Sequence, residues 1–115
     1  MNDRVSGDIY CLVLVTAGSE MEAETIAFSI VNDRLAACAS IHPIRSIYRW
    51  QGEVKKEPEW QIVFKTERAR FEDIAVKVRE LHSYELPEII SLSLDTCTDE
   101  YLHWLSGSLI ALNKP

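Results

Sequence analysis

The feature that most constrains this chain is a pair of extended segments, 37–50 and 53–66. Strands in globular proteins usually run about 5–6 residues, so each segment is roughly twice the usual length. A chain of 115 residues cannot cover such strands from end to end, and their excess must project beyond the domain. The charged, proline-containing stretch 55–58 is expected to form the hairpin turn, and Gly52 is expected to mark a bulge.

The projecting part of this hairpin carries large aromatic side chains. Tyr48, Trp50 and Trp60 would be costly to leave in water. Pro43 interrupts the first segment, which predicts a strand at the edge of a sheet or one with a bulge. A long exposed edge also invites pairing with another chain. The sequence therefore predicts an oligomer built on the hairpin; an unpaired, exposed hairpin is the alternative.

The rest of the chain alternates strand and helix patterns. A nearly all-apolar first run predicts a strand that is covered on both faces. Ser19 and Glu22 have the spacing of a capping box at the start of a helix. The predicted elements outside the hairpin are a strand at 9–16, a helix at 19–35, a helix at 71–82, a strand at 89–94, and a helix from Thr96 or Thr98 to residue 110.

The order of these elements defines a fold class. Strand-helix-strand-strand-helix-strand contains two split β-α-β units, which is the ferredoxin-like arrangement. We therefore expect an α+β fold, with a four-stranded antiparallel sheet, both helices on one face, a long central hairpin and an added C-terminal helix. Residues 1–8 are expected to be a polar tail, and residues 9–112 a single domain.

Charge and composition exclude several classes of function. The net charge of −6 argues against binding to nucleic acid or to anionic membranes, which needs a basic patch. The first residues lack the apolar core of a signal peptide, so a cytoplasmic location is expected. The three cysteines are an odd number without a CxxC pair, which suggests neither a disulfide framework nor a zinc site.

Four sequence blocks resemble a known family. They are LAACASIHPIRSIYRWQGEV at 35–54, FKT at 64–66, LHSYELPEII at 81–90 and DEYLHWL at 99–105. Together they resemble the CutA family of divalent-cation tolerance proteins over residues 9–110. The resemblance implies a ferredoxin-like fold and a homotrimer in which long hairpins pair edge to edge. It brings no catalytic reaction, so the chain is not expected to be an enzyme.

The resemblance also implies an interaction with metal ions. Members of the family are associated with tolerance to copper and other divalent cations, and some bind Cu(II). Their copper sites involve a cysteine in the first strand and histidines at the end of the second helix. This sequence has Val15 at the first of these positions, and Leu81 followed by His82 at the second. Cu(II) or another divalent cation is thus an expected ligand, but not an obligatory cofactor.

Two sets of residues are candidates for a site. His82 with Glu85 offers an imidazole and a carboxylate, which suit copper, zinc or nickel; a histidine that caps carbonyl groups is the alternative. The second set is a ligand cleft that the resemblance places between subunits, in which Lys65 would meet an anionic group and an aromatic ring would stack on a planar one; interface packing is the alternative. The members of this second set are Tyr48, Trp50, Lys65, Tyr84 and Glu88.

These sets separate two functions. A trimeric sensor of small molecules, similar in core to the nitrogen-regulatory trimers, would have a protected cleft that holds both Lys65 and Glu88. A metal-responsive protein would present His82 and carboxylates to solvent. An acylphosphatase-like enzyme is disfavoured, because the loop after the first strand is acidic and would repel phosphate.

Overall fold

The computed structural model describes residues 3–5 and 9–112 of the chain. It confirms the α+β class, and the elements follow the predicted order with two short strands added. They are β1 (Asp3–Val5), β2 (Tyr10–Ala17), α1 (Glu20–Asn32), β3 (Cys38–Trp50), β4 (Glu53–Glu67), a 3-10 turn η1 (Arg68–Arg70), α2 (Phe71–Leu81), β5 (Ile89–Ser93), β6 (Thr96–Thr98) and α3 (Asp99–Gly107).

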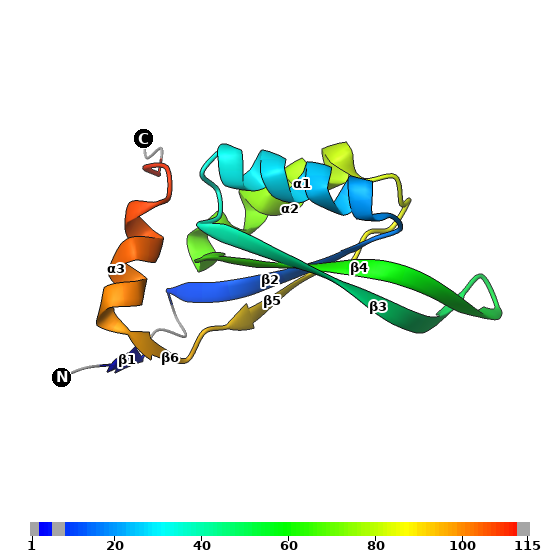
Figure 1. Ribbon diagram of the computed structural model, residues 1–115, viewed down its shortest axis with the longest axis horizontal. Coiled ribbons are helices and arrows are strands. Elements are labelled where there is room, and N and C mark those ends of the chain that lie inside the picture. Colours follow the sequence, from blue (N-terminus) through cyan, green and yellow to red (C-terminus); the bar gives the residue numbers. More distant parts are fainter. Residues whose placement is uncertain (1–2, 6–8, 113–115) are drawn as a thin grey trace.

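A four-stranded antiparallel sheet forms the centre of the molecule, in the order β3-β4-β2-β5. Helices α1 and α2 lie side by side over one face of this sheet (Figure 1). Ser19 accepts a hydrogen bond from the backbone N–H of Glu22 at 3.1 Å, which confirms the predicted helix cap. The edge position predicted from Pro43 is also confirmed, because β3 is an outer strand.

The core lies between the two helices and the sheet. Alternate residues of β2 point toward the helices, because successive side chains of a strand face opposite sides. Val13 and Val15 are fully buried there, and their partners Phe64 and Ile62 on β4 are fully buried as well. Residues from the helices complete this core: Ala23, Ile26, Ala27, Ile30, Ile74 and Val78.

The predicted position of the hairpin turn is wrong. The chain reverses at Gln51 and Gly52, and Trp50 pairs with Glu53 across this two-residue turn. Both turn residues have positive φ, at 51° and 81°, which is the type I′ geometry that matches the twist of a hairpin. The stretch 55–58 lies inside β4 instead. The hairpin projects beyond the rest of the sheet, so that the molecule measures 49 × 30 × 23 Å (Figure 1).

None of the helices that the structure describes lies over the opposite face of the sheet (Figure 1). Leu14 on β2 lies between Val63 of β4 and Ile90 of β5, and Leu12 is next to Leu92. Ile90 is 45% exposed and Leu92 is 47% exposed. An apolar patch of this kind is rare on an isolated soluble chain and is typical of an interaction surface. We call these five residues the uncovered face.

The C-terminal part forms a second, smaller core. Strands β1 and β6 pair with each other, and α3 follows β6 directly at the end of the molecule opposite the hairpin turn (Figure 1). Thr98 caps α3 by accepting from the N–H of Tyr101 at 3.3 Å, and the helix ends at Gly107 rather than at residue 110. The pairing of Asp3–Val5 adds a strand within the stretch expected to be a polar tail.

Helix length bears on any relation to membranes. Among the helices of the described residues, none is both long enough and apolar enough to cross a bilayer.

Candidate functional site

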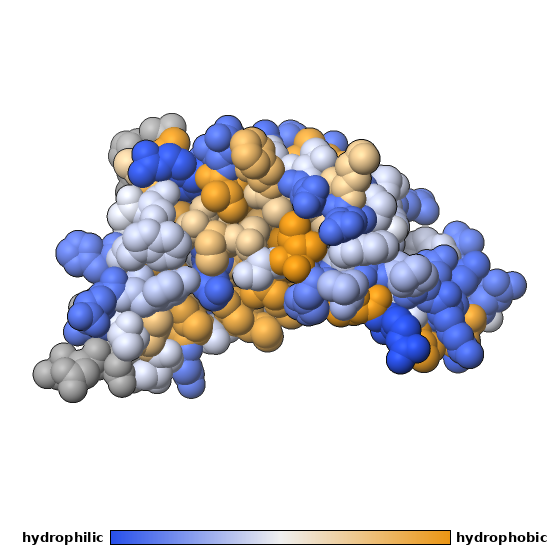
Figure 2. Space-filling view, in the orientation of Figure 1, coloured by the Kyte–Doolittle hydropathy of each residue, from blue (hydrophilic) through white to orange (hydrophobic). Residues whose placement is uncertain are grey.

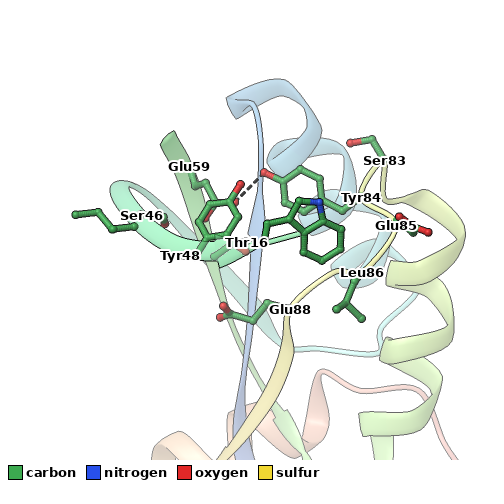
Figure 3. Close-up of a pocket in the computed structure, with 11 residues that line it drawn as sticks. Thr16, Ser46, Tyr48, Glu59, Ser83, Tyr84, Glu85, Leu86 and Glu88 are labelled. Carbon is green, nitrogen blue, oxygen red and sulfur yellow. Dashed lines mark hydrogen bonds between the residues drawn. The ribbon is translucent and has the colours of Figure 1, made fainter. Parts of the chain in front are cut away.

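A cleft of about 610 Å³ lies where the hairpin approaches the loop 82–88 between α2 and β5. Its walls combine aromatic, acidic and small polar side chains (Figure 3). The residues that line it are Thr16, Ser46, Ile47, Tyr48, Trp50, Glu59, Ser83, Tyr84, Glu85, Leu86 and Glu88. Its size is within the range of about 300–1,000 Å³ that is usual for small-molecule sites.

The first residue of the loop, His82, fixes where the loop begins. Its side chain is fully buried, and its Nδ1 accepts a hydrogen bond from the N–H of Tyr84 at 3.1 Å. On the other side of the ring, Nε2 forms a hydrogen bond with the carbonyl of Thr16 at 2.7 Å. Both ring nitrogens are used within the chain. The predicted alternative, a histidine that caps a carbonyl, describes this arrangement, although the carbonyl belongs to β2 and not to the helix.

A second contact ties the loop to α1. Both the N–H and the hydroxyl of Ser83 donate to the carboxylate of Glu22, at 2.7 and 3.1 Å. Burial by itself raises the pKa of Glu22, but the two hydrogen bonds from Ser83, together with the nearby His82 and the backbone of Gly18, hold the pKa below its ordinary value of 4.5. Glu22 thus serves as an anchor for the loop.

A third contact joins the loop to the hairpin. The hydroxyl of Tyr84 donates to the carboxylate of Glu59 at 2.7 Å, and the two side chains point toward each other in Figure 3. Burial and this hydrogen bond raise the pKa of Tyr84, so the phenol stays protonated. Gly18 makes room for the ring, because a Cβ at this position would lie 3.0 Å from the hydroxyl of Tyr84.

The cleft has a negative electrostatic character. Glu59 is only 6% exposed, while Glu85 and Glu88 lie closer to solvent. Partial burial and the neighbouring carboxylate of Glu59 raise the pKa of Glu88. On the hairpin side, the hydrogen bond from Tyr48 to Glu57 raises the pKa of Tyr48 to about 12.

The structure brings together most of the predicted ligand cleft. Tyr48, Trp50, Tyr84 and Glu88 all line it. Lys65 does not, since its Nζ lies 3.8 Å from Sγ of Cys38. Within one chain Lys65 and Glu88 do not share a cleft, and the cleft between subunits that would hold both stays a prediction.

The described residues of a single chain do not fit a metal centre. No group of three His, Cys, Asp or Glu side chains among residues 9–112 is close enough to hold an ion. His82 is buried with both nitrogens engaged, and Glu85 is an exposed residue that lines the cleft. A metal ion could reach the ring of His82 only after one of its two hydrogen bonds was broken.

The sequence alone did not identify two important residues of this region, Glu59 and Glu22. Alternation along β4 places Glu59 on the same side as Gln61 and Val63, which predicts an ordinary, partly exposed strand residue. Glu22 was read only as part of a helix cap. Their partners, Tyr84 and Ser83, are 25 and 61 positions away in the chain. No local pattern in one sequence indicates such contacts.

Comparison with known proteins gives the family. The model of the family described as CutA1 divalent ion tolerance protein matches residues 11–108. A divalent-cation tolerance protein CutA from Thermus thermophilus is 45% identical over 95 residues, which cover 82% of this chain and 92% of the relative. The protein of the same name from Thermotoga maritima is 35% identical over 99 residues, covering 86% and 98%.

Solved structures agree with the sequence comparison. CutA from Synechococcus elongatus superposes with a TM-score of 0.86 at 37% identity, covering 92% of this chain and 95% of that one. CutA1 from Oryza sativa gives a TM-score of 0.87 at 31% identity, covering 90% and 96%. The family model spans most of the chain and both relatives exceed 30% identity over more than two thirds of their length, so the protein belongs to the CutA1 family of divalent-ion tolerance proteins.

Proposed function

We propose that this protein acts as a homotrimer in the cellular response to divalent cations, without an enzymatic step, and that it binds Cu(II) weakly. The family and its relatives' names support the role in divalent-cation tolerance. The uncovered face is the main structural observation that supports the proposed assembly.

Apolar area is the first argument for assembly. Leu12, Leu14, Val63, Ile90 and Leu92 form neighbouring positions on three adjacent strands. Removing this patch from water would contribute favourable free energy at about 25 cal/mol per Å². Figure 2 shows further hydrophobic surface over the start of β3, beneath α1. The sheet therefore presents apolar area on the side without helices and along its β3 edge.

Unpaired strand edges are the second argument. Residues 60–67 of β4 pair with β2, whereas residues 53–59 pair with β3 alone among the described strands. The backbone groups on the open side of this segment can pair with a strand of another subunit. A homotrimer that pairs through its hairpins would satisfy them. The number three comes from the resemblance to the family.

The weak affinity for Cu(II) follows from the state of His82. To bind an ion, its ring must lose the hydrogen bond from the N–H of Tyr84 or the one to the carbonyl of Thr16. Each such loss costs about 0.5–1.5 kcal/mol. Glu85 is the carboxylate we propose as a further ligand, and a complete coordination sphere then requires ligands from another subunit.

Light scattering and calorimetry test the two parts separately. By light scattering we expect a mass of three chains at micromolar concentration; a monomer would contradict the proposal.

Calorimetric titration of chelator-stripped protein with Cu(II) should show weak, saturable binding that His82→Ala removes and Glu85→Gln weakens. His82→Asn is the matched control for folding, since its side-chain oxygen can still accept from the N–H of Tyr84. Binding that is unchanged in His82→Ala would refute this residue as a ligand.

The compartment is a separate question. The cytoplasmic location remains a prediction, and a CutA from Archaeoglobus fulgidus that superposes with a TM-score of 0.85 is described as periplasmic. Fractionation of cells that express the full chain checks it.

A further inference from the structure

The cleft has a composition that a divalent-ion role does not explain. Three of its eleven lining residues are glutamates, and none is lysine, arginine or histidine. Three more are the aromatic residues Tyr48, Trp50 and Tyr84. We propose that this cleft binds an organic ammonium cation.

Glu59 is the residue from which we infer that the ligand is positively charged. This carboxylate is nearly buried, and the hydroxyl of Tyr84 satisfies only one of its several lone-pair positions. A negative charge in such a place favours a positive partner, because water cannot solvate it fully. Glu88 contributes a second carboxylate, and the raised pKa of its side chain is consistent with a region where negative charges repel each other. An anionic ligand would meet the same repulsion.

The chemical class follows from the aromatic side chains. A quaternary or alkylated ammonium group binds favourably over the face of tryptophan or tyrosine, with its charge spread over methyl groups. A small metal ion instead needs several ligands in direct contact, and the described residues contain no cluster of that kind. The volume of about 610 Å³ also exceeds what a bare ion requires and suits a small organic molecule.

The cleft is preorganised for such a ligand. One wall is the loop 82–88, which is hydrogen-bonded to β2 through His82, to α1 through Ser83 and to β4 through Tyr84. Little conformational freedom remains to be lost on binding. The inference uses neither His82 nor Glu85 as a ligand, although Glu85 lines the cleft and His82 helps to hold its wall.

Calorimetric titration of the full-length protein, in its native assembly, with choline tests this inference. The matched ligand is 3,3-dimethylbutan-1-ol, which has the same shape without the charge. Glu59→Gln preserves an acceptor for Tyr84 and removes the charge, and Glu88→Gln removes the second one. Glu53→Gln at the hairpin tip, where the side chain is exposed and outside the cleft, is the matched charge control.

We expect saturable choline binding that weakens about tenfold or more in Glu59→Gln and measurably in Glu88→Gln, with no change in Glu53→Gln. Trp50→Leu should weaken binding, and Trp50→Phe should restore most of it. Absence of choline binding at millimolar concentration would overturn the proposal; a basic side chain of another subunit that fills the cleft would give this result. Equal binding of choline and its neutral analogue would overturn it as well.

Discussion

The hydroxyl of Tyr84 donates a hydrogen bond of 2.7 Å to the carboxylate of Glu59, and this contact joins the loop after α2 to the projecting hairpin. It gives a nearly buried carboxylate one hydrogen-bond donor and at the same time shapes one wall of the cleft. Stability and ligand binding therefore depend on the same pair of side chains. The variants below separate the two.

Replacing Tyr84 by phenylalanine should destabilise the protein by about 1–3 kcal/mol, because the buried carboxylate loses a donor. Urea unfolding at fixed protein concentration measures the difference. Glu59→Gln combined with Tyr84→Phe should destabilise the protein by less than the sum of the single changes, since the two side chains interact directly.

In alkaline absorbance titrations, the loss of a late-ionising tyrosine in Tyr84→Phe would identify the raised pKa of this phenol; an unchanged titration would contradict it.

Replacing Ser83 by alanine should raise the pKa of Glu22 toward its ordinary value, because the hydroxyl donor of Ser83 is removed. A carboxyl group whose pKa is lowered on folding stabilises the protein above its unfolded pKa and loses this contribution as the pH falls through the folded value. The variant should thus be less stable by about 1 kcal/mol at neutral pH, with a difference that shrinks in acid. Unfolding at several pH values tests this, and a difference independent of pH would argue against it.

Glu88→Gln should have the opposite effect on stability at neutral pH from that of Ser83→Ala. The pKa of Glu88 is raised in the folded protein, so the ionised carboxylate opposes folding above that pKa and the penalty disappears in acid. Since the side chain is exposed, we expect a gain of about half a kcal/mol or less at neutral pH. Thermal unfolding at neutral and acidic pH checks the direction. A loss of stability at neutral pH would show that Glu88 makes a favourable contact.

Ile90→Lys should lower the oligomer mass or make it dependent on concentration, because it places a charge in the apolar uncovered face. Val76→Lys is the matched control: Val76 is 48% exposed but lies on α2, on the other side of the sheet. Light scattering at several concentrations distinguishes the two. Dissociation caused equally by both variants would contradict the assignment of the interface.

The hairpin turn offers a change that should stabilise. Gln51 has a φ of 51°, a conformation that asparagine adopts more readily, so Gln51→Asn should gain about 0.5 kcal/mol. Gly52→Ala should cost about 1 kcal/mol. No atom lies within 4 Å of the added Cβ, so the positive φ alone accounts for this cost. Urea midpoints compare the two variants, and equal values would contradict the type I′ assignment.

Local patterns predicted the main elements. Ser19 caps α1, Pro43 lies on an edge strand, and the two long segments pair as a hairpin. The turn was misplaced because Pro58 and its charged neighbours resemble a turn. Pro58 is tolerated inside β4, since this part of the strand has a partner on one side only within the described residues. The turn signal was the glycine of Gln51-Gly52, which was interpreted as a bulge.

The candidate site was harder to predict, because its contacts join residues that are distant in the chain. Tyr48, Trp50, Tyr84 and Glu88 were expected together and line one cleft. Lys65 on β4 pairs with Cys38 of β3 and Leu12 of β2. Its side chain contacts Cys38 and does not line the cleft. The burial of Glu59 depends on the loop 82–88 packing beside the hairpin, a relationship set by tertiary structure alone.

The three hydrogen bonds that hold the loop 82–88 have a consequence for the rate at which a ligand arrives. A wall attached to β2, α1 and β4 cannot act as a lid without breaking several of these bonds at once. Entry would then require no prior opening step, and the association rate should follow diffusion and the attraction between opposite charges. Added salt would slow arrival by screening the glutamates, while departure would change little.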